Sequence, residues 1–163
     1  MIPYGKQDIN QADIDSVVDV LHSDFLTQGP KVIEFEKNLS DYCKAKYTKV
    51  VNNGTAALHL AYLAIGLKKD DIVWTTPNTF VATANSALYC GATIDFVDIN
   101  PKTYNLSIDC LEEKLIQAKE DNKLPKLVVP VHFAGQSCEM EEIWRLSQEY
   151  SFKVIEDASH ALG

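Results

Sequence analysis

The chain has 163 residues, of which 46% are hydrophobic and 23% are charged, so it suits one folded domain or part of a larger one and not a disordered segment. The formal net charge of −8 argues against nucleic acid or an anionic membrane as a partner, because those partners favour a basic surface. No apolar run approaches the roughly 18 residues of a membrane span, and the N-terminus lacks a signal-peptide pattern, so we expect a cytoplasmic protein.

Two amphipathic helices are predicted at the start of the chain. Asn10 precedes apolar residues at helical spacing and is the expected N-cap of the first helix. Residues 26–30 interrupt this pattern, and Pro30 suits the first turn of a second helix that continues to Tyr42.

A short β-branched run at residues 49–51 predicts a strand, and a tight turn leads from it into a helix. Gly54 would allow a ligand to approach the backbone closely, and Thr55 adds a hydroxyl group. Because the first N–H groups of a helix lack intrahelical partners and the helix dipole is positive there, this turn is a candidate anion site. Most such turns bind nothing, so the pattern alone leaves both interpretations open.

Strands and helices alternate along the rest of the chain. Further strands are predicted at residues 71–76, 93–98, 126–132 and 152–156, with helices between them. Gly66 and Gly91 are expected to end two of these helices. The alternation predicts an α/β domain with a mainly parallel sheet flanked by helices, in which ligands bind beyond the carboxyl ends of the strands.

Polar and aromatic residues follow these strand ends and are expected to gather at one edge of the sheet. The candidates are Gly54–Thr55, Asn78–Phe80, His132–Gly135, Asp157 and His160. Asp157 either caps a turn or pairs with a protonated ligand nitrogen, and its spacing leaves both open. Phe80 is either a ligand-stacking ring or a core aromatic. His160 either donates to a ligand oxygen or is an ordinary loop histidine, and His132, which closes an apolar strand, could serve a ligand or the structure.

No metal site or disulfide framework is predicted. The four cysteines are widely scattered, and none forms a C-x-x-C pair. We therefore expect reduced thiols that behave as small hydrophobic side chains.

Taken together, these stretches resemble the pyridoxal-phosphate (PLP) dependent aminotransferases of the DegT/DnrJ/StrS family, which act in nucleotide-sugar biosynthesis by aminating keto groups on nucleotide-linked sugars. The stretches that carry the resemblance are residues 26–30, 53–60, 76–85, 130–135 and 155–163. The resemblance implies the N-terminal part of a type I PLP-dependent aminotransferase large domain, with residues 1–163 as an incomplete PLP-binding domain. Within the family, the chain looks most like the UDP-4-amino-sugar transaminases of the pseudaminic-acid pathway.

The resemblance also implies roles for individual residues. The implied cofactor-binding residues are Gly54, Thr55, Ala56, Phe80, Asp157 and His160. The first three would hold the PLP phosphate, the phenyl ring would stack on the pyridine, the carboxylate would pair with the protonated ring nitrogen, and the imidazole would lie near the ring hydroxyl. The implied substrate-binding residues, which would line the sugar-nucleotide pocket, are Tyr4, Asp24, Phe25, Leu26 and Thr27.

The sequence departs from the family pattern at one important point. The family's Schiff-base lysine lies beyond the Asp157–His160 motif, in a segment that this sequence does not contain, so no catalytic residue is assigned. The resemblance implies a homodimeric parent enzyme that moves an amino group from an amino acid such as glutamate to a keto-sugar nucleotide. Because the lysine segment is missing, we expect the fragment to be inactive alone.

Three alternatives remain at this point. One is a related PLP-dependent sugar dehydratase, in which a histidine replaces the lysine. Another is a non-catalytic binding or assembly module from a truncated reading frame. A generic nucleotide-binding domain is disfavoured, because no G-x-G-x-x-G follows the first predicted strand.

Overall fold

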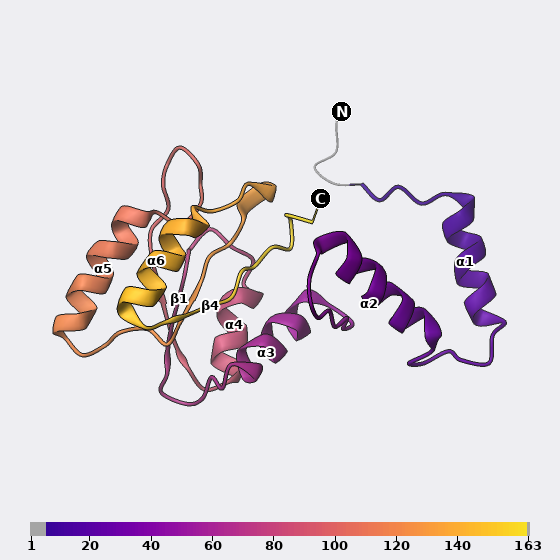
Figure 1. Ribbon diagram of the computed structural model, residues 1–163, viewed down its shortest axis with the longest axis horizontal. Helices are drawn as coiled ribbons and strands as arrows, with labels where there is room; N and C mark the ends of the chain where they lie inside the picture. Colours follow the sequence, from indigo (N-terminus) through magenta and orange to yellow (C-terminus); the bar gives the residue numbers. More distant parts are fainter. Residues whose placement is uncertain (1–5, 163) are drawn as a thin grey trace. The chain divides into compact units, whose positions relative to one another are not determined.

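The computed structural model describes residues 6–162, and the chain divides into two compact units at Val50 and Val51 (Figure 1). The first unit contains two helices, α1 (Gln11–Leu21) and α2 (Pro30–Cys43), and both were predicted. The Asn10 side-chain oxygen accepts hydrogen bonds from the backbone amides of Ala12 and Asp13, and the Asp13 carboxylate accepts one from the Asn10 amide. These bonds form a reciprocal N-terminal cap. Pro30 occupies the first turn of α2, as expected. Neither helix has a buried side chain among the described residues of this unit.

The prediction of a strand at residues 49–51 is wrong. Its backbone is held by a side chain and not by a neighbouring strand, because the Val50 amide donates to a Glu36 carboxylate oxygen over 3.2 Å. The other oxygen of Glu36 accepts the Lys49 ammonium at 2.6 Å. A strand requires a partner backbone, and no strand pairing in the described part of the chain includes this segment.

The second unit is built on a parallel four-stranded sheet in the order β2-β1-β3-β4. The strands are β1 (Ile72–Thr75), β2 (Thr93–Phe96), β3 (Leu127–Val129) and β4 (Lys153–Val154). Each lies inside a run that was predicted as a strand. β1 and β3 occupy the centre, which explains why their sequences are nearly continuous apolar runs.

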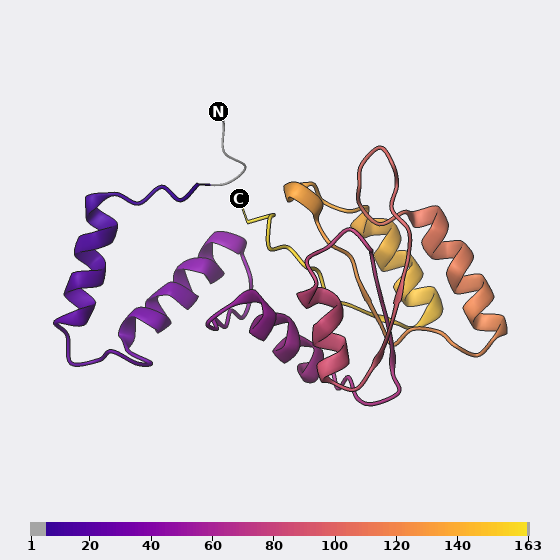
Figure 2. The same cartoon turned by 180° about the vertical axis from the view of Figure 1, so that it is seen from behind.

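Helices cover both faces of this sheet (Figures 1 and 2). They are α3 (Gly54–Ala64), α4 (Ala82–Tyr89), α5 (Ile108–Glu120) and α6 (Met140–Tyr150). Trp74 and Val128 pack against one core with α5 and α6, whereas Val73 and Leu127 pack against a second core with α3 and α4. Adjacent strand residues therefore serve opposite faces, as the alternation of side chains along a strand requires. The predicted α/β architecture with a parallel sheet is confirmed.

Glycines end α3 and α4 where the sequence predicted. Gly66 and Gly91 follow the last helical turns with φ angles of 75° and 77°, a conformation that disfavours residues with a Cβ atom. A short 3-10 turn, η1 (Phe133–Gly135), lies in the loop that follows β3. Among residues 6–162, no helix has both the length and the apolar character that crossing a bilayer would require.

Candidate functional site

Asp157 lies at the carboxyl end of the sheet, in line with β3 and β4. Its amide donates to the Pro130 carbonyl at 2.9 Å, and its own carbonyl accepts the His132 amide at 3.1 Å. A parallel bridge between Val131 and Asp157 thus extends the β3–β4 pairing by one more step. The side chain is consequently placed by the sheet, and the residue is only 7% exposed.

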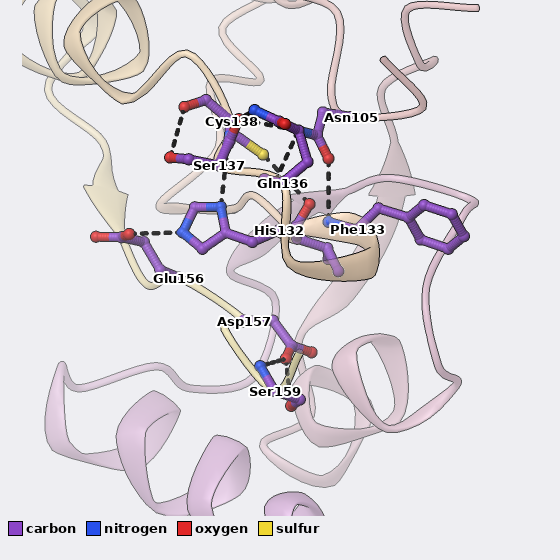
Figure 3. A network of polar contacts seen from close by, with 10 residues as sticks. Asn105, His132, Phe133, Gln136, Ser137, Cys138, Glu156, Asp157 and Ser159 are labelled. Carbon is purple, nitrogen blue, oxygen red and sulfur yellow. Dashed lines mark hydrogen bonds and ion pairs between the residues drawn. The ribbon is translucent and has the colours of Figure 1, made fainter. Parts of the chain in front are cut away.

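The Asp157 carboxylate is buried among neutral donors. Oδ2 accepts the Thr83 hydroxyl at 2.7 Å, and Oδ1 accepts the Ser159 hydroxyl at 2.7 Å and the Ser159 amide at 3.3 Å (Figure 3 shows the Ser159 contacts). Among residues 6–162, none of the ion pairs includes this carboxylate. A carboxylate has about four acceptor positions, so one position on Oδ2 receives no donor from residues 6–162 and is open to a ligand. A buried charge of this kind is stabilised by a cationic partner.

Phe80 and His160 lie beside Asp157. The three residues line a small hollow of 40 Å³ together with Thr79, His132 and others. Phe80 is 74% exposed, which rules out the alternative of a core aromatic residue. The predicted meeting of these strand-end residues at one edge of the sheet is therefore correct, while the role assigned to each stays a prediction.

The N-terminus of α3 shares a second hollow with Asp157. This groove of 240 Å³ is lined on one side by Gly54 and neighbouring residues of α3 and on the other by residues 155–159. A Cβ atom on Gly54 would meet no atom of residues 6–162 within 4 Å, so the described chain leaves the space in front of this residue open. The amides of Gly54 and Thr55 donate to no acceptor among residues 6–162, which suits an anion.

The amide of Ala56 is already engaged. Asn53 is the N-cap of α3, and its Oδ1 accepts the Ala56 N–H at 2.8 Å. Ala56 therefore offers a phosphate no free donor unless Asn53 moves away, unlike Gly54 and Thr55. The sequence contained a signal for this arrangement, because asparagine immediately before a helix is a strong N-cap.

His132 is part of a structural network at the same edge. It is 5% exposed, its Nδ1 accepts the Cys138 amide at 3.1 Å, and its Nε2 lies 2.7 Å from a Glu156 oxygen (Figure 3). An Nδ1 that accepts carries no hydrogen, so Nε2 carries the hydrogen and donates it to Glu156. Both ring nitrogens are thereby used within the protein.

Asn105 holds the loop that follows β3. Its side-chain NH₂ donates to the carbonyls of Gln136 and Ser137 at 2.9 and 3.0 Å, and its Oδ1 accepts the Phe133 amide at 3.0 Å (Figure 3). Asn105 is 4% exposed. Neither Asn105 nor Thr83 was recognised from sequence, because each acts through a contact with a distant segment.

The residues predicted to bind the sugar nucleotide belong to other parts of the sequence than the residues that line the two hollows. Tyr4 lies outside the described residues. Asp24, Phe25, Leu26 and Thr27 belong to the first unit, in the connection between α1 and α2. Within that unit, Phe25 and Leu26 line a hollow of 190 Å³, and the substrate role of all five residues stays a prediction.

Two kinds of chemistry are missing from the described part of the site. No cluster of three or more metal-ligating side chains occurs among residues 6–162. Neither hollow at Asp157 is lined by a lysine within that range. The residues present fit a ligand with a protonated ring nitrogen, a flat face and an anionic group.

Comparison with known proteins points to one family. A family model described as the DegT/DnrJ/EryC1/StrS aminotransferase family matches residues 7–163. A relative from Campylobacter jejuni, UDP-4-amino-4,6-dideoxy-N-acetyl-beta-L-altrosamine transaminase, is 46% identical, and the match covers 100% of this chain and 42% of the relative.

Solved structures agree with the sequence comparison. PseC of Helicobacter pylori, an aminotransferase involved in the biosynthesis of pseudoaminic acid, superposes with a TM-score of 0.89 at 34% identity, covering 99% of this chain and 42% of that one. NtdA of Bacillus subtilis with bound cofactor PMP superposes with a TM-score of 0.80 at 34% identity, covering 89% and 32%. The chain therefore spans less than half the length of these relatives.

Proposed function

This chain belongs to the DegT/DnrJ/EryC1/StrS aminotransferase family, and we propose that it forms the part of a sugar aminotransferase that holds pyridoxal 5′-phosphate. The observation that carries the proposal is the Asp157 carboxylate, which is buried, surrounded by neutral donors and left with a free acceptor position on Oδ2. A protonated pyridine nitrogen is the donor that best suits it, because it brings both a hydrogen and a positive charge.

Each residue around the two hollows has a distinct task in this proposal. PLP, when bound, supplies an electron sink for the carbanion that forms on the amino-group donor or acceptor. Asp157 keeps a proton on the ring nitrogen, and Phe80 covers one face of the ring. The amides of Gly54 and Thr55, at the positive end of α3, would bind the phosphate, and His160 would lie near the ring hydroxyl.

The substrate assignment extends this proposal. Family membership and the C. jejuni relative support a keto-sugar nucleotide as the amino-group acceptor. The finer assignment to the pseudaminic-acid pathway is supported by the likeness to PseC. We propose glutamate as the amino donor and a homodimer as the form of the whole enzyme.

We further propose that the 163-residue chain binds the cofactor without a covalent bond and does not catalyse transamination alone. The lining of the two hollows, which contains no lysine among residues 6–162, supports this proposal. Mixing the chain with PLP and glutamate should then yield no pyridoxamine phosphate. Formation of that product, or a single lysine modified after borohydride treatment, would contradict this part of the proposal.

Cofactor binding itself is tested by titration with pyridoxamine 5′-phosphate (PMP), which lacks the aldehyde and so forms no adducts with surface lysines. Replacing Asp157 by Asn keeps the shape of the side chain and removes its charge. We expect the affinity for PMP to fall at least tenfold, because a hydrogen bond to a charged group contributes about 1.5–3 kcal/mol. Asp98→Asn is the matched control, because Asp98 also follows a strand but caps the Ile99 amide outside both hollows. Equal affinities for the two variants would overturn the proposal.

A further inference from the structure

Thr83 is a fully buried polar residue near the start of α4. Its exposed fraction is 0%, and its hydroxyl donates to Oδ2 of Asp157 at 2.7 Å. A buried hydroxyl requires a hydrogen-bond partner, and here the partner is the charged group at the centre of the candidate site. The contact joins α4, on one face of the sheet, to the segment that follows β4.

A second threonine fixes the direction of this contact. The hydroxyls of Thr79 and Thr83 lie 2.8 Å apart. Because Thr83 has one hydroxyl hydrogen and uses it on Asp157, Thr79 must be the donor to Thr83. The result is a relay of two hydroxyls that runs from the hollow beside Phe80 to Asp157, and such chains strengthen each hydrogen bond by polarisation.

Tyr62 holds the backbone of α4 at the same point. It is fully buried, and its hydroxyl donates to the Thr83 carbonyl at 2.9 Å. Burial, followed by the negative charge of Asp157, raises the pKa of the Tyr62 phenol above its usual value, so the hydroxyl remains a donor. Thr83 is therefore constrained at both its backbone and its side chain.

The two oxygens of Asp157 are not equivalent. Oδ1 accepts two hydrogen bonds from Ser159, whereas Oδ2 accepts one, from Thr83. The free acceptor position therefore belongs to the oxygen that Thr83 holds. We propose that Thr83, supported by Thr79, is a positioning residue that aims this free lone pair of Asp157 at the ring nitrogen of the cofactor.

This inference rests on the proposed function, and the experiment separates the two. PMP is titrated into the 163-residue chain and into variants, and each titration is repeated with the 1-deaza analogue of PMP, in which carbon replaces the ring nitrogen. Thr83→Val keeps the shape of the side chain and removes the hydroxyl. We expect Thr83→Val to weaken PMP binding about tenfold and to change binding of the 1-deaza analogue by less than about twofold. Thr83→Ser, which restores a hydroxyl, should recover most of the affinity for PMP.

Each outcome has a distinct meaning. Equal weakening of PMP and its analogue by Thr83→Val would show a general packing role and would overturn the inference. Unchanged PMP affinity in Thr83→Val, with a loss in Asp157→Asn, would overturn it while the proposed function stands. Unchanged affinity in Asp157→Asn would overturn the proposed function itself. If Thr83→Val does not fold, Thr79→Val is tested in its place, because Thr79 is only partly buried. We expect Thr79→Val to lower the affinity for PMP by a smaller factor and to leave binding of the 1-deaza analogue unchanged.

Discussion

A Cβ atom on Gly135 would lie 2.9 Å from the carbonyl oxygen of His160. Gly135 also has a φ angle of 87°, which residues with a Cβ atom rarely adopt. The loop after β3 can therefore lie against the segment after β4 only because a glycine stands at the point of contact. The close contact between Gly135 and the His160 carbonyl helps to position His160 in the hollow that it lines with Asp157 and Phe80.

We predict that Gly135→Ala destabilises the chain by about 2–4 kcal/mol, from backbone strain and the clash with His160 together. Gly66→Ala is the matched control, because Gly66 has a similar φ of 75° but no atom of the described chain within 4 Å of its Cβ position. It should cost only the strain, about 1 kcal/mol. Urea unfolding measures both losses, and the His160 imidazole resonances should shift in the first variant alone. Equal losses would show that the contact with His160 carries no strain.

Most of the fold could be predicted because its signals are local. The apolar runs of β1 and β3 and the glycines after α3 and α4 each occupy a few consecutive residues. The predicted strand at residues 49–51 failed for the opposite reason. A β-branched run becomes a strand only beside another backbone, and Glu36 supplies the Val50 amide with an acceptor from a side chain.

Gly54→Ala separates a binding role from a folding role at the start of α3. Gly54 has open space at its Cβ position and no positive φ, so alanine should leave stability unchanged or raise it by about 0.4–1 kcal/mol. The added methyl group would occupy the space where a phosphate approaches, so PMP affinity should fall several-fold. Urea unfolding and PMP titration on the same samples measure the two effects. A stabilised variant that binds PMP normally would contradict the phosphate role.

The candidate site could be predicted only in part. Asp157 and Phe80 were found because the residues that follow parallel strands must gather at one edge of the sheet. Thr83 and Asn105 were not found, because their partners are distant in sequence and their burial depends on the packed structure. The sequence therefore identifies residues that follow a strand, such as Asp157, whereas only the folded structure identifies the residues that support them, such as Thr83.

The His132 network provides a test of the assigned tautomer. His132→Phe should cost about 1–3 kcal/mol, because it leaves the buried Cys138 amide without an acceptor. Glu156→Gln should cost less than about 0.5 kcal/mol at pH 7, because the amide oxygen of glutamine still accepts the Nε2 hydrogen. The comparison uses free energies of unfolding in urea. A large loss in Glu156→Gln would indicate an imidazolium in place of the neutral imidazole that the contact with the Cys138 amide requires.

Cys138 should make the stability of the chain depend on alkaline pH. Burial raises the pKa of the Cys138 thiol from 9.0 to about 11, and the thiol donates to the Val131 carbonyl over 3.2 Å. The folded state therefore binds the thiol proton more tightly than the unfolded state does. This contribution to stability is fully present below pH 9 and is lost as the pH rises toward 11.

The measurement is the free energy of unfolding at several pH values between 8 and 11 for the wild-type chain and for Cys138→Ala. Other groups also titrate in this range, so the relevant quantity is the difference between the two curves. The wild-type curve should fall more steeply than that of Cys138→Ala between pH 9 and 11. Cys43→Ala is the control, because Cys43 is exposed and its removal should leave the slope unchanged. Parallel curves for the wild-type chain and Cys138→Ala would show that the buried thiol ionises as freely in the folded chain as in the unfolded one.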